Sequence, residues 1–575
     1  MPGGPVAAQL DEQPLIVEHD AREDVNEPNF VGDASAAKGK RTPTPWRSLL
    51  VLTALNAVCP LAFELIYPFV NSMIVEIGVT KDPERVGFYS GLVESIFSLS
   101  SLLMILPFGY ISDHIGRKPV VLLGLGGLSV SIVCFGLSKS LLGMIMSRCI
   151  GGALGASWAA IKVMTGEMTD RSNQDTAFSM MNVSYRLGQI VGLPLGGLLA
   201  HPERRWTMFQ TPFWNEYPFL LPCLVGAGFS LVSILFGMAF VEETLPSKVK
   251  ARRKSKQPTY GSTSPTTLES AAPLLNDGEL ETNKPVQKPT WRTVMTPSIV
   301  SLVLNNACMC IASEMLFSLY PLFAFTPITS GGLGMSEAEI GTQMSVRAVV
   351  HVGIMLFYAP INRKLGTTRL YQVTMAFWAI VVLGFPFLHW AASRTGIKSV
   401  VFNAAQLVFF FTWSICGFAW VCMGSMVTDA SPSAEALSLI NGNYVDWNVS
   451  LDDEKGATCP GRVILCCASC VDSLSYTSHV ACRPSYVGRR LSSKHQISPQ
   501  HITLDTGISQ ISIVLPQTIS PALANSLFAA SVDKHIMGGN FVWVLLFVFT
   551  CLGFLHSLAL KEPQDDWRTK QELDE

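Results

Sequence analysis

The sequence predicts an all-α, polytopic membrane protein in which twelve transmembrane helices form two six-helix bundles. Three observations support this fold class. The chain has 575 residues, of which 49% are hydrophobic and only 15% are charged, and a soluble protein of this size would carry more charge on its surface. Apolar runs near the roughly 20-residue length that crosses a bilayer recur along most of the chain. These runs fall into two sets of six, with a polar stretch between the sets.

Run length and flanking polar residues place each span. The first six spans lie at about 46–72, 86–110, 119–138, 140–163, 177–200 and 217–241. The second six lie at about 294–326, 338–360, 367–390, 398–428, 507–531 and 538–560. The two bundles therefore occupy residues 46–241 and 293–560.

Polar segments lie outside the bundles. Residues 1–45 and 561–575 form tails, and residues 242–292 form a linker rich in Ser, Thr, Pro and charge, a composition typical of disorder. Lys and Arg gather in this linker, around the termini and in the loops at 116–119 and 362–369. The positive-inside rule then places both tails and the linker in the cytoplasm.

One segment of the second bundle breaks the pattern. Residues 444–506 carry five of the fourteen cysteines and no sustained apolar run. The segment is either a real loop or translated non-coding sequence, and its composition, which suits neither a helix nor a low-complexity linker, favours the second interpretation. It holds one CxxC without a second spaced pair, so no metal site is predicted.

The two halves repeat weakly. Glu64 in "FELIYPF" corresponds to Glu314 in "SEMLFSLYPLF", and Gly116 in "DHIGRK" corresponds to Gly366 in "NRKLGTTR". Both pairs have the same offset of 250 residues, since 314 minus 64 equals 366 minus 116. Two landmarks at one offset indicate a duplicated six-helix unit.

The loop between spans two and three carries the most specific motif. It reads "GYISDHIGRKP" and contains Gly109, Asp113, Gly116, Arg117 and Lys118. We expect the glycines to permit a tight cytoplasmic turn, and Asp113 and Arg117 to form an ion pair in a gate that can make and break. A role in topology alone would require only the basic residues.

This spacing resembles the loop signature of the major facilitator superfamily, in which the Asp is thought to interact with the N-terminal end of span eleven and to stabilise the outward-facing state. Span four and the loop after it, "SRCIGGALGASWAAIKVMTGEMTDRSNQDTAFS", resemble fungal and plant members related to zinc-induced facilitator-like carriers and to tetracycline-resistance exporters. The resemblance implies a carrier whose two bundles rock about a central cavity.

Span five resembles the glycine and proline motif of proton-driven exporters. Its residues are Gly188, Gly192, Pro194, Gly196 and Gly197, and it departs from the motif because Leu193 occupies the place of the motif's Pro. The glycine spacing gives a helix a flat face, so close packing against a neighbour is the alternative to an exporter-specific role.

Charged residues inside the spans indicate function, because an ionised side chain at the bilayer centre costs at least roughly 2.5–3.5 kcal/mol. They are Glu64, Glu94, Arg148, Arg186, Glu314 and Arg347. We expect these acids and bases to neutralise one another around a central cavity. Arg148 matches a span-four arginine that is implicated in proton transfer in the exporters, and Glu64 or Glu94 is the carboxylate that it would modulate. A static buried ion pair is the alternative for each glutamate.

Together these features predict a secondary active transporter, a proton-coupled antiporter that exports a drug, toxin or secondary metabolite. The alternatives are a proton-coupled uptake carrier and a non-transporting or defective protein. No P-loop, HExxH or nucleophile elbow occurs, so we expect no enzymatic activity, no catalytic residue and no cofactor. The expected partners are a small-molecule substrate, protons and the lipid bilayer, without nucleic acid, for a monomer in the plasma membrane or alternatively the vacuolar membrane.

Overall fold

The computed structural model describes residues 45–169, 174–245, 248, 297–429 and 508–560, which fall within one compact unit. The predictions made for the two tails, for most of the linker and for the segment 444–506 concern residues outside these ranges.

The described residues form helices and turns, with no strand. The helices of the first half are α1 Trp46–Phe63, α2 Val70–Glu76, α3 Val86–Ile115, α4 Arg117–Gly136, α5 Leu141–Gly155, α6 Ala159–Met168, α7 Gln174–Leu199, α8 Pro202–Arg205, α9 Pro212–Glu216 and α10 Leu220–Phe240. Those of the second half are α13 Pro297–Phe325, α14 Glu337–Met355, α15 Tyr358–Leu365, α16 Thr367–Thr395, α17 Val400–Ile415, α18 Phe418–Asp429, α20 Ile508–Asp533 and α21 Phe541–Leu558.

Ten candidate spans in the described ranges are long and apolar enough to cross a membrane, or eleven if the pair α14 and α15, bent by 50°, counts as one span. The sequence predicts an unbroken span where this bend lies. Helix α7 is 26 residues long but lies outside this apolar set, and it carries polar residues such as Arg186 and Gln189. The polytopic all-α fold class is confirmed, and the count of twelve stays a prediction.

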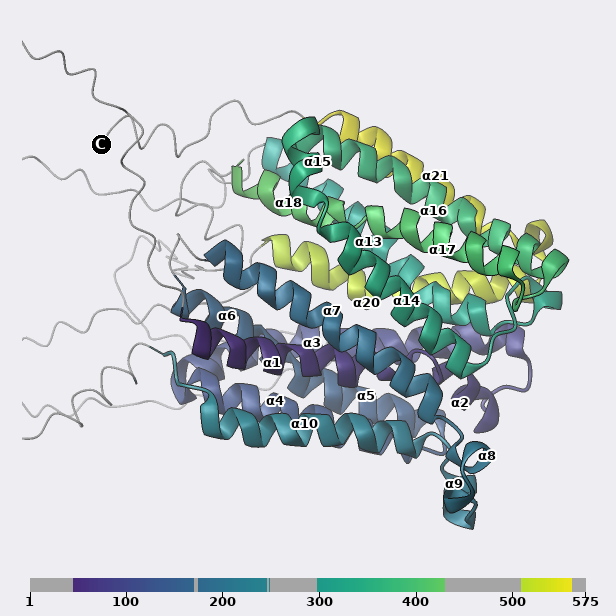
Figure 1. The fold of residues 1–575 in the computed structure, drawn as a ribbon, viewed down its shortest axis with the longest axis horizontal. Helices are drawn as coiled ribbons and strands as arrows, with labels where there is room; N and C mark the ends of the chain where they lie inside the picture. The colour runs from purple at the N-terminus through teal and green to yellow at the C-terminus, as the bar shows by residue number, and fades with distance from the viewer. Residues whose placement is uncertain (1–44, 170–173, 246–247, 249–296, 430–507, 561–575) are drawn as a thin grey trace, which may run out of the picture. The chain divides into compact units, whose positions relative to one another are not determined.

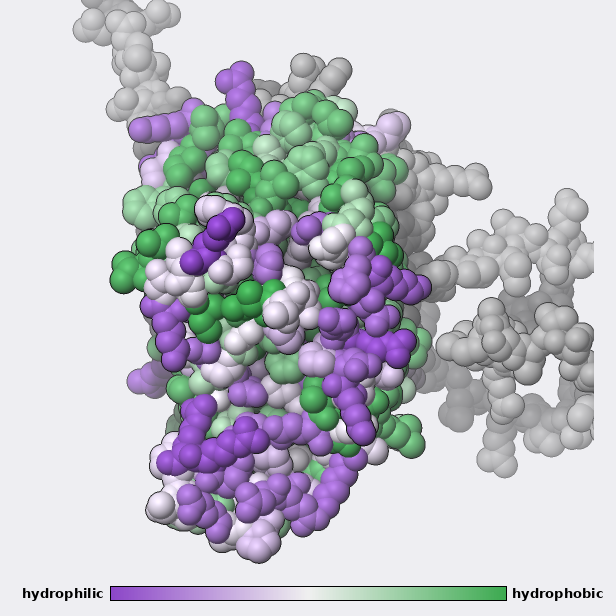
Figure 2. All heavy atoms as spheres, turned by 90° about the vertical axis from the view of Figure 1, so that its right-hand side faces the viewer, coloured by the Kyte–Doolittle hydropathy of each residue, from purple (hydrophilic) through white to green (hydrophobic). Residues whose placement is uncertain are grey.

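Figure 1 shows the helices of the two halves running side by side, with the first half in purple to blue and the second half in green to yellow. Two pairs of helices join the halves: α3 packs against α20, and α7 packs against α14. We call the end that carries the turn at Gly116 the motif end and the opposite end, with α8 and α9, the lobe end. Figure 2 views the lobe end, whose lower part is largely hydrophilic.

Local sequence explains where several helices begin and end. Ser336 begins α14 with a capping box, in which its side chain and that of Glu339 satisfy each other's backbone N–H groups. Gly116 ends α3 and begins α4 with φ +113°, and Gly366 joins α15 to α16 with φ +78°. L side chains rarely adopt this backbone region, so glycine permits both sharp reversals.

Two predicted spans of the first half contain a break in their helix. Helix α1 gives way to a 3-10 turn at Glu64–Ile66 before α2 begins, four residues after Pro60. Helices α5 and α6 are separated by a second 3-10 turn at Ala156–Trp158. Non-helical backbone is tolerated in membrane proteins where it is buried in protein or lines a cavity. These breaks therefore mark the neighbourhood of Glu64 and Trp158 for closer inspection.

Glycines bring the two halves into close contact toward the lobe end. A Cβ added at Gly87 or Gly91 of α3 would lie 2.4 or 2.6 Å from the Asn525 or Pro521 carbonyl oxygen of α20. A Cβ added at Gly197 of α7 would lie 2.1 Å from the Glu337 carbonyl oxygen of α14. Such distances are too short for any side chain, so the backbones of opposing halves touch only because these positions are glycine.

Candidate functional site

The predicted gate motif forms a compact ion cluster at the motif end. The Asp113 carboxylate lies 2.6 Å from the Arg117 guanidinium, one turn along the chain, and the Glu167 carboxylate at the end of α6 lies 3.2 Å from the same guanidinium. Arg117 also donates a 3.0 Å hydrogen bond to Ser112 Oγ. The Arg117 side chain is nearly buried, so its charge is neutralised by two carboxylates from different helices.

Glu243, just after α10, holds the turn from the other side. Its carboxylate accepts hydrogen bonds from the backbone N–H groups of Arg117, at 2.8 Å, and Lys118, at 3.2 Å. These are orphan donors at the start of α4, where a carboxylate also meets the positive end of the helix dipole. A Cβ at Gly116 would lie 2.4 Å from Glu243 Oε2, so the glycine makes room for this cap.

The sequence predicts that Gly109 belongs to the turn, and this prediction is wrong. It lies inside α3, and an added Cβ there would meet nothing within 4 Å. Helix α3 continues through Gly109 to Ile115. Within this motif only Gly116 has the positive φ that the reversal requires. The N-terminal approach to span eleven, where the resemblance places a partner of Asp113, lies outside the described residues before Ile508.

The span-five glycines face two different helices. Cβ atoms added at Gly188, Gly192 and Gly196 would lie within 2.6 Å of backbone carbonyl oxygens of α1 or the 3-10 turn that follows it. Gly197 instead faces α14 of the second half. Pro194 lies inside the continuous helix α7, and a Cβ at Gly341 of α14 would contact Leu193 and Pro194. The motif thus packs both within its half and across the boundary between the halves.

Glu64 sits in the 3-10 turn after α1 and is only 2% exposed. Its carboxylate accepts a 2.7 Å hydrogen bond from the Tyr185 hydroxyl and bonds of 2.8 and 2.6 Å from Gln189 Nε2, both on α7. Arg186 donates a 2.7 Å hydrogen bond to Gln189 Oε1. Because a buried carboxylate needs donors, this network accounts for Glu64 in so apolar a place.

A second polar cluster adjoins this network toward the motif end. Asn56 of α1 accepts a 2.9 Å hydrogen bond from Trp158 Nε1 and donates 2.8 Å bonds to the Met181 carbonyl and to Ser184 Oγ of α7. The Trp158 ring stacks on Tyr185 with centroids 5.6 Å apart. Asn56 therefore ties together helices from three predicted spans next to Glu64.

Glu94 lies on α3 at the boundary between the halves and is 3% exposed. Its carboxylate accepts a short hydrogen bond from the hydroxyl of Ser318 on α13, in the second half. Asn525 of α20 donates a 3.0 Å bond to the same hydroxyl. The next residue, Ser95, accepts a 2.9 Å bond from the backbone N–H of Ala522, which follows Pro521. A protonatable group thus belongs to a hydrogen-bond chain that crosses from one half to the other.

The buried arginines are partnered by aromatic rings. The Arg148 guanidinium lies 4.7 Å from the Phe63 ring centroid and 4.5 Å from that of Phe97. Arg347 in the second half lies 5.0 Å from Phe317 and 4.4 Å from Trp413. Cation–π contact of this kind stabilises a desolvated cation.

The expected mutual neutralisation of the six intramembrane charges is therefore not found as ion pairing. Within the described ranges, no salt bridge joins Glu64, Glu94 or Glu314 to any arginine. Arg148 acts electrostatically on Glu94 from a greater distance, and Arg186 and Arg347 act on both Glu64 and Glu314. Aromatic rings and neutral hydrogen-bond donors supply the close contacts instead. Each charge is therefore stabilised separately rather than by an opposite charge.

Polar contacts between the halves gather toward the lobe end. Arg85 lies 3.5 Å from Asp533, Glu84 accepts a 2.6 Å hydrogen bond from Ser330, and Ser345 donates a 2.7 Å bond to the Ile190 carbonyl. Among the described residues, the hydrogen bonds and the ion pair between the halves lie within roughly three helical turns of that end. In the described residues, polar contacts therefore join the two halves at the lobe end and at the level of Glu94.

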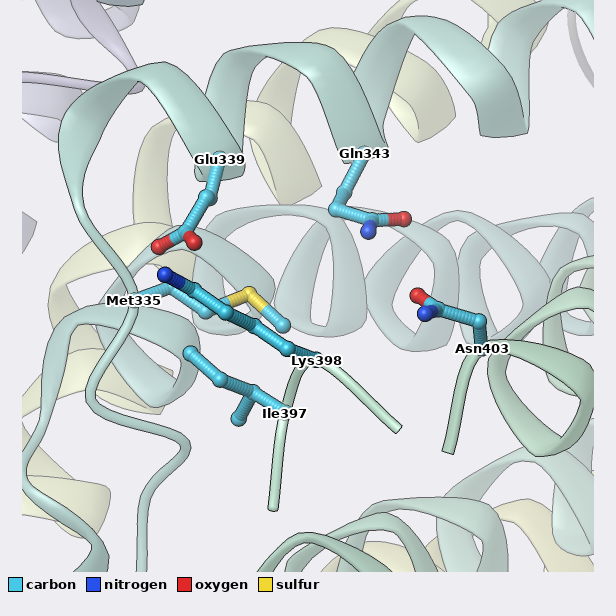
Figure 3. A pocket seen from close by; sticks show the side chains of 6 residues that line it. All are labelled: Met335, Glu339, Gln343, Ile397, Lys398 and Asn403. Carbon is cyan, nitrogen blue, oxygen red and sulfur yellow. The ribbon is translucent and has the colours of Figure 1, made fainter. Parts of the chain in front are cut away.

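A pocket of about 250 Å³ opens at the lobe end of the second half. Figure 3 shows the end of the Lys398 side chain directed toward Glu339. The side chains of Gln343 and Asn403 point toward each other at the right of the view. Its remaining lining residues are Met335 and Ile397. None of the buried intramembrane charges lines this pocket, and among the described residues no cluster of three His, Cys, Asp or Glu side chains suits a metal ion.

Sequence reasoning missed the partners of the charged residues. Tyr185, Gln189, Ser318 and Asn525 are ordinary polar residues inside predicted spans, and Glu243 lies in what the sequence assigns to the linker. Gln189 follows Arg186 by three residues and therefore shares its helix face, which is the one signal that was available. The other contacts join residues far apart in the chain.

Comparisons with known proteins identify the fold and its family. A family profile described as Major Facilitator Superfamily matches residues 52–444. The major facilitator-type transporter psiT2 of Psilocybe cubensis is 26% identical over 90% of this chain and 90% of its own length. The efflux pump azaK of Aspergillus niger is 29% identical over 71% of this chain and 79% of its own.

Further matches agree with the sequence-based resemblance. The protein zinc induced facilitator 1 of Arabidopsis thaliana is 25% identical over 64% of this chain and 75% of its own. A bacterial homologue of the human lysosomal transporter Spinster has the same fold, with a TM-score of 0.55 and 12% identity over 90% of this chain and 97% of that structure. The chain belongs to the major facilitator superfamily and is a multi-pass membrane transporter, not an enzyme.

Proposed function

We propose that the chain is a proton-coupled antiporter that exports a small organic molecule, and that Glu94 carries the coupling proton. The supporting observation is the hydrogen bond from Ser318 to Glu94, which crosses the boundary between the halves. The relatives named efflux pump and multidrug transporter support export as the direction.

A carboxylate at this boundary can sense which arrangement the halves adopt. With the lobe end closed, ionised Glu94 accepts the Ser318 hydroxyl and experiences the positive charge of Arg148. When the halves separate at the lobe end, Ser318 moves away with the second half and Glu94 loses that donor. Binding a proton then costs less, because the ionised form has lost a charge-assisted hydrogen bond.

This difference gives the proton a direction. Glu94 takes up a proton when the lobe end is open and releases it when closure restores the bond to Ser318. The positive-inside rule places the motif end in the cytoplasm, so each cycle carries a proton inward. Substrate that binds from the cytoplasm to the deprotonated carrier then drives the return step, which is antiport.

Glu64 has a different role in this proposal. Both of its donors, Tyr185 and Gln189, lie on α7 of the same half, so rocking of the halves does not remove them. The network positions Arg186 through Gln189 and holds α1 to α7. Drugs, toxins and a secondary metabolite remain the candidate substrates, as the sequence predicts.

The gate cluster supports the same cycle. Arg117 is held by Asp113, Glu167 and Ser112, and Glu243 caps the following helix. All these partners belong to the first half, so the cluster stays with its bundle as the halves rock. The ion pair with Asp113 is the contact that we expect to change when the motif end closes.

Purified full-length protein in proteoliposomes with an imposed pH gradient tests the proposal. The assay follows lumenal pH with a trapped pH-sensitive dye while tetracycline, ethidium or rhodamine 6G is supplied. We expect wild-type protein to move protons against at least one of these probes. In Glu94→Gln the rate of proton-driven transport should be at least about tenfold lower than in the wild type. The variant should still exchange labelled probe across the membrane when the pH is equal on both sides.

Ser318→Ala provides the matched variant, because it removes the donor and leaves the carboxylate. We expect it to retain coupled transport with a shifted pH dependence. Proton-driven transport that survives in Glu94→Gln would refute Glu94 as the carrier of the proton, and probe movement with the proton rather than against it would replace export by uptake.

A further inference from the structure

Residues 200–219 form a lobe between the fifth and sixth predicted spans. The lobe contains α8, a 3-10 turn at Thr207–Phe209, and α9. In Figure 1 it lies past the end of α10 and to the side of the helical bundle. A connection between neighbouring spans can be far shorter, so the extra length and its position call for an explanation.

Aromatic rings pack against one another in the lobe. Five of them form a continuous series of contacts, with centroid distances of 6.0 Å for Trp206 and Phe209, 4.9 Å for Phe209 and Trp214, 5.3 Å for Phe213 and Trp214, and 5.4 Å for Phe213 and Tyr217. The series is not sealed from the surroundings. Trp206 is 41% exposed, Phe213 48% and Met208 75%.

Ion pairs fix the lobe to the ends of the membrane helices. His201 and Arg204 each lie 3.2 Å from the Glu76 carboxylate at the end of α2. On the other side, Lys139 in the turn between α4 and α5 pairs with Glu216 and lies 4.6 Å from the Tyr217 ring centroid. The lobe is therefore held in one place relative to three spans.

The neighbouring helix α10 presents an exposed apolar surface along its length. Leu231, Val232 and Leu235 are among its strongly exposed apolar residues, which is expected only where a membrane helix contacts acyl chains. The lobe continues this surface beyond the helix end. Its outward face, seen in the lower part of Figure 2, is largely hydrophilic, and its exposed polar residues include Arg204, Arg205 and Gln210.

We propose that the lobe is a membrane-interface anchor whose partner is the phospholipid leaflet at the lobe end, with the aromatic side chains at the boundary between headgroups and acyl chains. Trp and Tyr favour this boundary because their rings combine an apolar body with a polar group. The polar outward face stays in water.

Two features distinguish this anchor from a loop that only packs on itself. A self-contained loop would turn its apolar groups inward, whereas Met208 and Phe213 remain exposed. The lobe also lies past the end of α10 and to the side of the bundle rather than over its middle, where a surrounding bilayer would lie beneath it. The inference uses the position and chemistry of the lobe and does not depend on proton coupling.

Photocrosslinking in a defined bilayer tests the anchor. The photoreactive residue p-benzoylphenylalanine replaces Phe213, or in a second variant Met208, in the full-length protein reconstituted in phosphatidylcholine and phosphatidylserine nanodiscs. After illumination, intact-protein mass spectrometry measures the fraction that carries one phospholipid. We expect this fraction to be at least about fivefold larger at both positions than at Lys81, an exposed polar residue in the loop between α2 and α3.

Val232, 65% exposed on α10, provides the positive control because its place on a membrane helix must contact lipid. Unchanged thermal unfolding midpoints check that the variants fold. If Val232 yields lipid adducts while Phe213 and Met208 yield no more than Lys81, the anchor is refuted. Crosslinks from the lobe to a second copy of the chain would equally overturn it, in favour of a protein contact.

Discussion

Corresponding glutamates in the two halves have different surroundings. Glu64 and Glu314 share the offset of 250 residues that relates the halves, since 314 minus 64 is 250. Glu64 is buried and accepts hydrogen bonds from Tyr185 and Gln189 on α7. Glu314 is partly exposed, and its carboxylate accepts a 3.3 Å bond from Gln517. The repeat keeps an acid in span one of each half, but the first half surrounds its acid with a tighter set of donors.

The glycine turns show the same contrast. Gly116 and Gly366 each end one helix and begin the next, with φ of +113° and +78°. At the same offset, however, Asp113 corresponds to Arg363 and Arg117 to Thr367, as 363 minus 113 and 367 minus 117 both equal 250. The reversal needs a glycine in both halves, whereas the ion pair belongs to the first half.

A pair of histidines extends the comparison to the lobe end. His201 follows Leu199, the last residue of α7, by two positions, and His535 follows Asp533, the last residue of α20, by two positions. Both have positive φ, 54° and 49°. His201 is buried, whereas His535 is exposed. Backbone reversals are therefore repeated, while the charged contacts have become specific to one half.

The largest expected difference between the halves is at the two glutamates. Glu64→Ala leaves the Tyr185 hydroxyl and the Gln189 amide buried without their acceptor, which costs about 1–3 kcal/mol for each group. We expect a clear fall in the thermal unfolding midpoint of the purified protein in detergent, together with loss of transport. Glu314→Ala removes one longer bond at a partly exposed site and should change the midpoint much less.

Glu64→Gln separates the charge from the contacts. An amide oxygen still accepts one of the two donors, so this variant should recover part of the lost stability. Equal effects of alanine at Glu64 and Glu314 would contradict the idea that the donors on α7 distinguish the two sites.

The next largest difference is expected at the glycine turns. Alanine at either position must adopt a backbone conformation that is nearly restricted to glycine, which costs about 1–3 kcal/mol of stability. At Gly116 the added Cβ also meets Glu243 Oε2 at 2.4 Å. Gly116→Ala should therefore lower the unfolding midpoint more than Gly366→Ala.

A double-mutant cycle with Glu243→Ala isolates the contact. Removing Glu243 abolishes the steric conflict, so Gly116→Ala should cost less in the Glu243→Ala background than in the wild type. The cost of Gly366→Ala should be the same in both backgrounds, and a change there would show that the effect is not local.

The sequence carried enough information for the apolar spans that the structure confirms and for the glycine turn at Gly116, because both depend on local properties. Apolar run length reports burial in lipid, and the four-residue spacing of Gly188, Gly192 and Gly196 reports a helix face that can touch another backbone. The same local reasoning failed at Gly109, where a glycine inside a helix looks no different from a glycine in a turn.

The partners of the charges could not be predicted in this way. Glu94 and Ser318 are 224 residues apart, and Arg117 and Glu243 are 126 residues apart, so only the packing of helices brings them together. Arg148 was expected beside a carboxylate, yet it lies between Phe63 and Phe97. A buried arginine is stabilised by either kind of partner, and composition does not distinguish them.

The smallest expected difference between the halves is a pH dependence at the two histidines. Burial of the His201 ring opposes its protonation, but the carboxylates of Glu76 and Glu203, 3.2 and 3.1 Å from its two nitrogens, outweigh that cost and raise the pKa of His201 above 6.5. A raised pKa in the folded state stabilises the fold fully below the unfolded value and loses that contribution as pH rises through the folded value. We therefore expect the unfolding midpoint to fall as pH increases above about 6.5.

His201→Asn tests this dependence, because Asn tolerates positive φ but does not titrate. The variant should lose the part of the midpoint decrease that wild-type protein shows between about pH 6 and pH 9, and its difference from wild type should be largest at the acidic end. His535→Asn makes the same exchange at the corresponding exposed turn and is the matched control. If both variants flatten the profile equally, the carboxylates around His201 are not its cause, and the titration belongs to the repeated turn rather than to the ion cluster of the first half.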